Sequence, residues 1–214
     1  MSYNKNILEG RECLMIHEFK DSYLDLKLDN YILTFDDGLY NHYTTYKKII
    51  KKFPDIRLYY FISTDIIYNK DLNKAEQIDN INSAIAHDMY FANNDKRAFL
   101  TYDQILEMSK CLNITIGVHG HKHLNIDTLK KEHKLLNRIE NFRTDSHSML
   151  NEITKFIDNK IIDEKHVIYC TPYNQYSELE MGILKAEFYE QHEAILTIIG
   201  PGRKSIEELE EQKS

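Results

Sequence analysis

The stretch YILTFDDG at residues 31–38 decides the fold. Its first five residues have the apolar, aromatic and β-branched composition of a buried strand, which ends abruptly at Asp36, Asp37 and Gly38. Two adjacent carboxylates at the end of such a strand repel each other and are costly to desolvate, and a nearby cation relieves both problems. Gly38 lets the chain turn, so both side chains can face one pocket. The alternative is a helix N-cap, which explains one aspartate better than the pair.

Strand-like and helix-like segments alternate along the rest of the chain. The spacing predicts strands at residues 13–19, 57–63, 114–118, 166–170 and 194–199, and helices at 43–53, from 101, at 128–159 with a break near 144–146, from 177 and from 205. This alternation predicts an α/β fold with parallel strands. An open doubly wound sheet and a barrel both satisfy it, and both place ligands at the carboxyl ends of the strands.

We expect one catalytic domain over residues 1–214. Residues 65–100 lack a clear period and are interpreted as an insertion with some helix. A charged helix is expected at about 205–214, and its acidic run at 207–211 is interpreted as a solvated face.

A histidine cluster, HGHKH at residues 119–123, directly follows the predicted strand at 114–118. If the chain turns after His119, the side chains of His119 and His123 can converge. Two imidazoles and one carboxylate would leave a zinc ion with an open position, which is typical of a catalytic site. Histidine-rich turns also occur on ordinary surfaces, but the coincidence with Asp36 and Asp37 at another strand end favours a metal site.

A third polar segment, Cys170-Thr-Pro172-Tyr173, follows the predicted strand at 166–170. Pro172 restricts the backbone, and the Tyr173 ring could stack on a sugar face. A turn with a packed ring is the simpler alternative.

The composition excludes several classes of protein. The chain has 214 residues, of which 42% are hydrophobic and 29% are charged, so neither disorder nor a membrane span is expected. Its net charge is −7. Its basic residues are scattered among acids, so nucleic acid is not an expected partner. Three cysteines without a Cys-x-x-Cys spacing, and a first segment without an apparent signal peptide, predict a cytoplasmic protein.

Three motifs occur in a recognisable order: TFDDG at 34–38, HxxxH at 119–123 and PY at 172–173. This order resembles the polysaccharide deacetylase family, which includes chitin-oligosaccharide and peptidoglycan deacetylases. CLMIH at 13–17 and YYFIST at 59–64 are similar to softer features of that family.

The resemblance implies a distorted, incomplete (β/α) barrel with one divalent metal ion, most simply zinc. It implies that Asp37, His119 and His123 bind the ion and that Asp36 is the general base. The backbone N–H of Tyr173 would help to hold the oxyanion, and the Pro172–Tyr173 segment would contact substrate. His121 is not a ligand in this match.

The expected activity is removal of an acetyl group from an N-acetylated amino sugar or related saccharide, such as a nucleotide-linked or lipid-linked intermediate. The insertion, with His87, Asp88, Tyr90, Phe91 and Arg97, is a candidate substrate-recognition element. No oligomeric state is predicted.

The sequence also departs from the family. Cys170 stands where an arginine usually orients the base, a tryptophan motif is absent, and the general acid is unassigned, with His192, His17 and Arg203 as the possibilities. A catalytically degenerate saccharide-binding protein is therefore one alternative. A cyclic amidase or phosphoesterase is another, and in that case His121 would be a ligand.

Overall fold

The computed structural model describes residues 7–69, 76–126, 134–175 and 177–211. These residues form one eight-stranded sheet with the spatial order β1-β2-β3-β4-β5-β6-β7, and β8 pairs with β2. The strands are β1 (Ile7–Leu8), β2 (Arg11–Ile16), β3 (Tyr31–Phe35), β4 (Arg57–Ile62), β5 (Ile114–Val118), β6 (His166–Cys170), β7 (Ile195–Ile199) and β8 (Lys204–Ser205).

The sheet is an incomplete α/β barrel, as predicted. β2 to β7 pair in parallel in chain order, β8 is parallel to β2, and β1 is antiparallel to β2. Among the described strands no pair joins β7 directly to β2. The chain instead leaves β7 and crosses to β8, which lies on the free edge of β2. Residues 200–203 therefore span the gap in the barrel.

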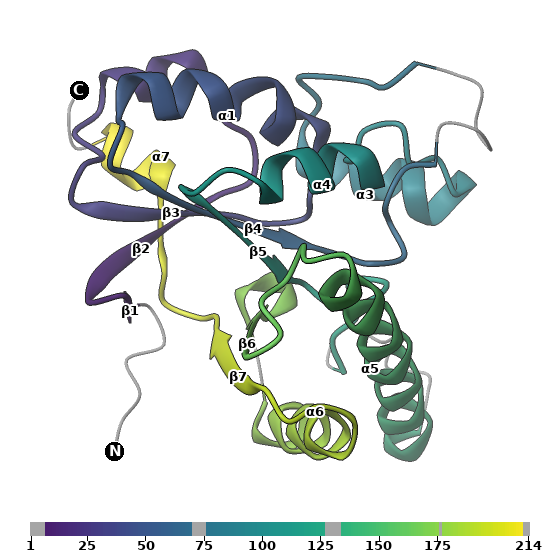
Figure 1. Ribbon diagram of the computed structural model, residues 1–214. Coiled ribbons are helices and arrows are strands. Elements are labelled where there is room, and N and C mark those ends of the chain that lie inside the picture. Colours follow the sequence, from purple (N-terminus) through teal and green to yellow (C-terminus); the bar gives the residue numbers. More distant parts are fainter. Residues whose placement is uncertain (1–6, 70–75, 127–133, 176, 212–214) are drawn as a thin grey trace.

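Helices connect the parallel strands and cover the outside of the sheet. They are α1 (Tyr40–Lys52), α3 (Ser83–Asn93), α4 (Tyr102–Ser109), α5 (Leu135–Asp158), α6 (Glu178–Gln191) and α7 (Ile206–Glu211), with short 3-10 helices at Asp21–Asp25 and Pro172–Asn174. In Figure 1, α1 and α4 lie above the strands, and α5 and α6 lie below them.

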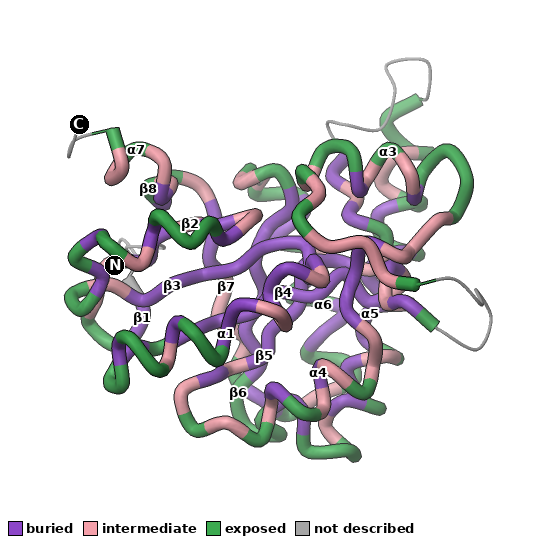
Figure 2. Tube along the Cα trace, turned by 90° about the horizontal axis from the view of Figure 1, so that it is seen from above, coloured by how far each residue is buried: buried purple, intermediate pink, exposed green. Residues whose placement is uncertain are grey.

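Side chains alternate between the two faces of the strands. On β4, Leu58 and Tyr60 pack in the large core under the helices, whereas Tyr59 and Phe61 pack in a smaller core inside the barrel. The interior is tightly filled: a Cβ atom added at Gly117 would lie only 2.7 Å from the Phe61 ring. Figure 2 accordingly shows the central strands β3 and β4 as buried runs, with exposed residues on the outward turns of the helices.

Three predicted strands, at 31–35, 114–118 and 166–170, have the bounds that the structure shows. The capping boxes at Thr101 and Ser177 are both present, with Gln104 and Glu180 as their partners. Hydrophobic spacing and cap chemistry are local signals, and here the tertiary structure agrees with them.

The predicted break at 144–146 is wrong. Residues 127–133 lie outside the described residues, but α5 runs without interruption from Leu135 to Asp158. Asp145 is buried because its carboxylate accepts two backbone N–H groups of the loop after β5. A tertiary contact, and not a helix end, explains this polar residue.

The insertion contains one described helix, α3, and its residues 70–75 lie outside the described part. The acidic run of α7 is only partly solvated. Glu207 accepts a hydrogen bond of 2.9 Å from the hydroxyl of buried Tyr23.

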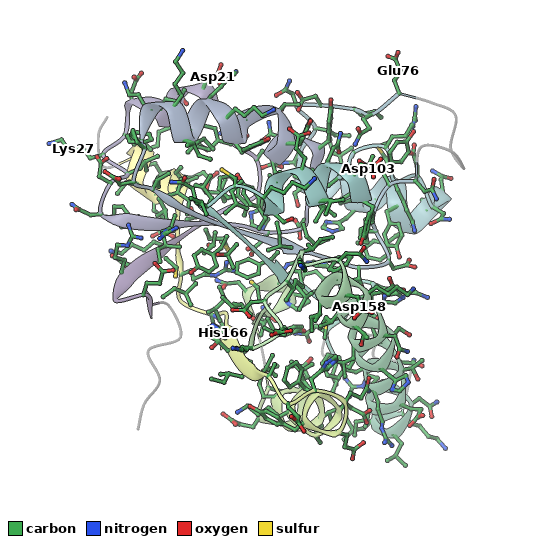
Figure 3. All side chains as sticks on the ribbon, in the orientation of Figure 1. Asp21, Lys27, Glu76, Asp103, Asp158 and His166 are labelled. Carbon is green, nitrogen blue, oxygen red and sulfur yellow. The ribbon has the colours of Figure 1, made fainter. Side chains whose placement is uncertain are left out.

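The outer surface carries most of the charge. The six residues labelled in Figure 3 are all exposed and lie at the periphery of the molecule: Asp21, Lys27, Glu76, Asp103, Asp158 and His166. Within the described ranges, no helix combines the length and the apolar character needed to cross a bilayer.

Candidate metal centre and active-site cleft

The ends of β3 and β5 bring together the three residues expected to bind metal. Asp37 Oδ1 lies 3.4 Å from His119 Nε2 and 3.2 Å from His123 Nε2, and the two Nε2 atoms are 3.2 Å apart. All three residues are buried. Four ligands that surround zinc at 2.0–2.1 Å lie about 3.3 Å apart, so these three donor atoms have the spacing of a tetrahedral site.

The backbone at two of these positions adopts the left-handed conformation. φ is 74° at Asp37 and 58° at His123, values that cost free energy in residues other than glycine and persist only where the surroundings enforce them. The loop after β5 is held by Asp145, whose carboxylate accepts N–H groups from His121 at 3.1 Å and Lys122 at 3.0 Å. Asp145 thereby fixes the turn that lets His123 return to His119.

The protonation of His119 indicates what the cluster requires. Its Nδ1 lies 2.9 Å from the carbonyl oxygen of Cys170, so this nitrogen carries the proton and donates it. In the neutral ring, Nε2 then directs a lone pair at the Asp37 carboxylate. A lone pair that faces a carboxylate is unfavourable unless a positive charge lies between them.

The pKa of Asp37 agrees with this requirement. Burial raises it, but hydrogen bonds that the rings of His119 and His123 donate when protonated outweigh burial and hold the pKa well below its usual range. Burial lowers the pKa of His123, which favours the neutral imidazole that binds metal. An ionised carboxylate beside a neutral imidazole fits a divalent cation.

Asp36 lies on the interior side of the barrel mouth and is paired with Arg203. Its Oδ1 and Oδ2 accept hydrogen bonds from Arg203 Nη1 at 2.9 Å and Nη2 at 2.6 Å. Arg203 also donates to Thr34 Oγ1 at 3.0 Å, and only 4% of it is exposed. Arg203 comes from the segment that spans the gap between β7 and β8.

This pairing bears on two departures from the family. Cys170 stands where an arginine usually orients the base, but Arg203 reaches the Asp36 carboxylate from a distant part of the chain. Asp36 also helps to raise the already high pKa of Arg203 despite burial, which disfavours Arg203 as a proton donor.

A second group, Asp36, His119 and Cys170, also has the spacing of a metal site. Burial raises the pKa of the Cys170 thiol, which lies 3.7 Å from both oxygens of Asp36 and stays protonated. Both carboxylate oxygens already accept from the guanidinium of Arg203. A second cation is therefore disfavoured at this position.

A cleft of about 600 Å³ opens over the cluster. It is lined by Met15, His17, Asp36, Asp37, Ser83, Ala84, His87, Asp88, Phe91, His119, His123, Tyr173, Asn174 and Gln175. The Tyr173 ring lies 4.4 Å from the His123 ring, between ring centres, and 43% of Tyr173 is exposed. Tyr173 has a φ of 57°, so the turn after buried Pro172 directs the ring toward the cleft.

Helix α3 forms another wall and adds two residues whose roles the sequence did not predict. Ser83 Oγ donates to Asp37 Oδ2 at 2.6 Å, and His87 Nε2 lies 3.8 Å from Asp37 Oδ1. The His87 ring stacks on His123 with centres 4.5 Å apart, and burial lowers the pKa of His87 to about 4. The i, i+4 spacing of Ser83 and His87 was the available signal, since it places both on one helix face.

The other candidates from the insertion divide into two groups. Asp88 and Phe91 line the cleft. Tyr90 donates to Asp65 at 2.5 Å and Arg97 pairs with Asp95 at 2.7 Å, so these two side chains support the insertion itself.

Two other histidines lie apart from the cleft lining, whereas His17 is part of it. His121 Nδ1 is 2.8 Å from Thr64 Oγ1, and His192 packs on the Phe188 ring at 5.2 Å between ring centres. His17 follows the end of β2 and faces the cleft. The candidate metal ligands therefore do not include His121, which the amidase and phosphoesterase alternative would require.

The fold is similar to that of several solved structures. A de-N-acetylase from Aggregatibacter actinomycetemcomitans matches 90% of this chain and 79% of its own, with a TM-score of 0.54 and 14% identity. The deacetylase domain of BpsB from Bordetella bronchiseptica matches 82% and 71%, with a TM-score of 0.52 and 14% identity. A polysaccharide deacetylase from Bacillus cereus matches 94% and 68%, with a TM-score of 0.52 and 10% identity.

No protein-family model and no curated protein matches the sequence. The likeness therefore rests on the arrangement of the strands and helices. The chain has the fold of the polysaccharide deacetylases, an incomplete α/β barrel.

Proposed function

We propose that this protein is a metal-dependent hydrolase that removes the acetyl group from an N-acetylated amino sugar or a related saccharide. One observation carries the proposal: the ligand atoms of Asp37, His119 and His123 lie 3.2–3.4 Å apart at the base of a cleft that also contains the paired carboxylate of Asp36. The deacetylases that share the fold support the same class of reaction.

Asp37, His119 and His123 would hold one divalent ion, most simply zinc. Such an ion lowers the pKa of water from about 15.7 toward about 7 and polarises a carbonyl oxygen. The hydrogen bond from His119 Nδ1 to the Cys170 carbonyl fixes the ring so that Nε2 faces the ion site.

Asp36 would accept the proton of the attacking water. Burial raises its pKa, but the charge and hydrogen bonds of Arg203 outweigh burial, so the net pKa is lowered and the group is ionised at neutral pH. The two hydrogen bonds of Arg203 also fix the plane of the carboxylate. A base that is already ionised and oriented needs no rearrangement before the proton moves.

Tyr173 would contribute in two ways. Its backbone N–H would donate to the amide oxygen as negative charge develops there, and its ring would contact a sugar face. Pro172, expected from the sequence to contact substrate, is buried outside the cleft lining and would only position this ring. The exposed ring of Phe91, on α3, lines the same cleft and offers a second apolar surface.

His17 is our candidate for protonating the departing amine. It faces the cleft from the end of β2, and Asp36 lines the same cleft. A histidine within reach of the base and the leaving group can donate the proton that the amine requires.

We place the reaction in the cytoplasm and expect a small saccharide, not nucleic acid, as the partner. Cys13, Cys111 and Cys170 are free thiols, which suits a reducing compartment. The net charge of −7 disfavours a phosphate backbone as ligand.

The test is acetate release from N-acetylated amino sugars, with and without added zinc, for the wild type and Asp36→Asn. The wild type should release acetate only with metal, and Asp36→Asn should lose about 10²–10⁴-fold in rate. Asp29→Asn, at an exposed position, removes one carboxylate charge outside the cleft and serves as the control. Metal binding without acetate release in any of the three would instead favour a saccharide-binding protein.

A further inference from the structure

Helix α3 brings two side chains to the same carboxylate. Ser83 and His87 are four residues apart and share a helix face, and both are directed at Asp37. Ser83 Oγ donates to Oδ2 at 2.6 Å, while His87 Nε2 lies 3.8 Å from Oδ1, the oxygen that also faces His119 and His123. The Ser83 hydroxyl therefore binds Oδ2 of Asp37, and the His87 imidazole is directed at Oδ1.

His87 Nε2 is buried and has no hydrogen-bond partner in the described part of the chain. An unpaired buried nitrogen costs about 1–3 kcal/mol, so such an atom generally has a partner. The ring is held by stacking instead: its centre lies 4.5 Å from that of His123, 5.6 Å from that of Phe99 and 5.9 Å from that of Phe91. Packing thus holds the ring beside the cluster while its nitrogen has no partner among the described residues.

We propose that His87 is a fourth protein ligand of the ion, so that the insertion completes a centre of three histidines and one carboxylate. This inference rests on the metal site of the proposed function. The potential ligand atoms of Asp37, His87 and His123 all lie within 4.8 Å of one another. To bind the ion, the His87 ring would turn out of its stack on His123 and move about half an ångström closer, which brings its 3.8 Å separation from Asp37 Oδ1 to the spacing of zinc ligands.

A fourth ligand is compatible with catalysis, because zinc centres can expand to five ligands. The additional imidazole is neutral, so it adds no charge to a site that already contains one carboxylate. Three imidazoles favour zinc, copper, nickel or iron over magnesium and calcium. The ion would also link the insertion to the ends of β3 and β5, and thereby hold α3 over the cleft.

The experiment replaces zinc by cobalt(II) in the full-length protein and records its proton NMR spectrum. A cobalt-bound imidazole shows its remaining ring N–H as a strongly shifted, solvent-exchangeable signal, so these signals count the histidine ligands. We expect three in the wild type and two in His87→Ala. Zinc affinity, measured by competition with a chromophoric chelator, should fall at least about tenfold in His87→Ala.

His121→Ala is the matched control, because it removes an imidazole from the same region that contacts Thr64 and not the cluster. His121→Ala should show three shifted signals and should bind zinc as tightly as the wild type. His87→Gln retains a polar side chain on α3 and should also show two signals, so the result does not depend on one variant.

The inference is overturned if the wild type shows two shifted signals and His87→Ala binds zinc as tightly as the wild type. In that case the ion is still held and the proposed function stands. If the wild type binds no cobalt, the metal site fails, and the proposed function fails with it.

Discussion

Asp36 and Arg203 form a buried ion pair that determines the state of the proposed base. Both groups are almost fully buried, and two hydrogen bonds of 2.9 and 2.6 Å join them. Removing one partner of a buried pair leaves the other charge without compensation, which costs about 3–5 kcal/mol. The pair is therefore a structural element as well as part of the cleft.

Arg203→Met should lower the free energy of unfolding by about 3–5 kcal/mol in urea titrations. Asp36→Asn/Arg203→Met should lose clearly less than the sum of the two single variants, because it removes both charges together. If the loss of unfolding free energy in the double variant equals the sum of the losses in the two single variants, Asp36 and Arg203 do not stabilise each other.

The same pair predicts a pH dependence. The folded pKa of Asp36 lies below its unfolded value of about 3.9, so the stability from its ionised form is complete above that pH and is lost as the pH falls through the folded pKa. In Arg203→Met, burial dominates and raises the folded pKa, so the ionised group destabilises that variant at neutral pH. The difference in unfolding free energy between the two proteins should be largest near pH 7 and narrow toward pH 4. The measurement is made with a chelator present. If the difference in unfolding free energy between the wild type and Arg203→Met does not change with pH, the ion pair does not set the pKa of Asp36.

His17→Gln tests the assignment of the acid. The rate of amide hydrolysis should fall about 10²–10⁴-fold, because the amine cannot leave without a proton. Hydrolysis of 4-nitrophenyl acetate, whose leaving group needs no proton, should change much less. Equal losses on both substrates would mean that His17 supports the cleft and does not donate the proton.

At the scale of elements, α5 positions the metal loop through one side chain. Asp145 accepts the N–H groups of His121 and Lys122, one on each carboxylate oxygen. Asp145→Asn keeps the size of the side chain but replaces one acceptor by a donor, so one of these bonds is lost. The loop then holds His123 less firmly.

Zinc affinity should fall about 10–100-fold in Asp145→Asn, as expected for a residue that orients ligands. Asp158→Asn, at an exposed position on the same helix, is the control and should bind zinc as the wild type does. Unchanged affinity in Asp145→Asn would show that the loop holds its own shape.

Local signals in the sequence were sufficient for most of the parallel strands and their helices and for part of the site. The strand at 31–35 and the Thr101 capping box depend on neighbouring residues, and the structure agrees with them. Asp37 and His119 could be placed together because the carboxyl ends of parallel strands meet at one edge. The break at 144–146 was wrong because the partners of Asp145 lie more than 20 residues away.

At the scale of the whole molecule, the open side of the barrel explains what sequence patterns could not predict. The chain crosses from β7 to β8 through residues 200–203, and this crossing brings Arg203 to Asp36 across 167 positions of sequence. His87 comes from an insertion without a clear period. Neither residue belongs to a motif, and no local pattern places either of them beside Asp36 or Asp37.

The central claim is that Asp37, His119 and His123 together hold one divalent ion, and the most direct test is the zinc retained per chain after dialysis. Asp36→Asn and Asp37→Asn make the same substitution at adjacent residues, so each is the control for the other. The wild type and Asp36→Asn should retain about one zinc ion per chain, and Asp37→Asn should lose it, because Asp36 pairs with Arg203 whereas Asp37 faces the two histidines. Full retention of zinc by Asp37→Asn, or none by the wild type, would contradict the claim.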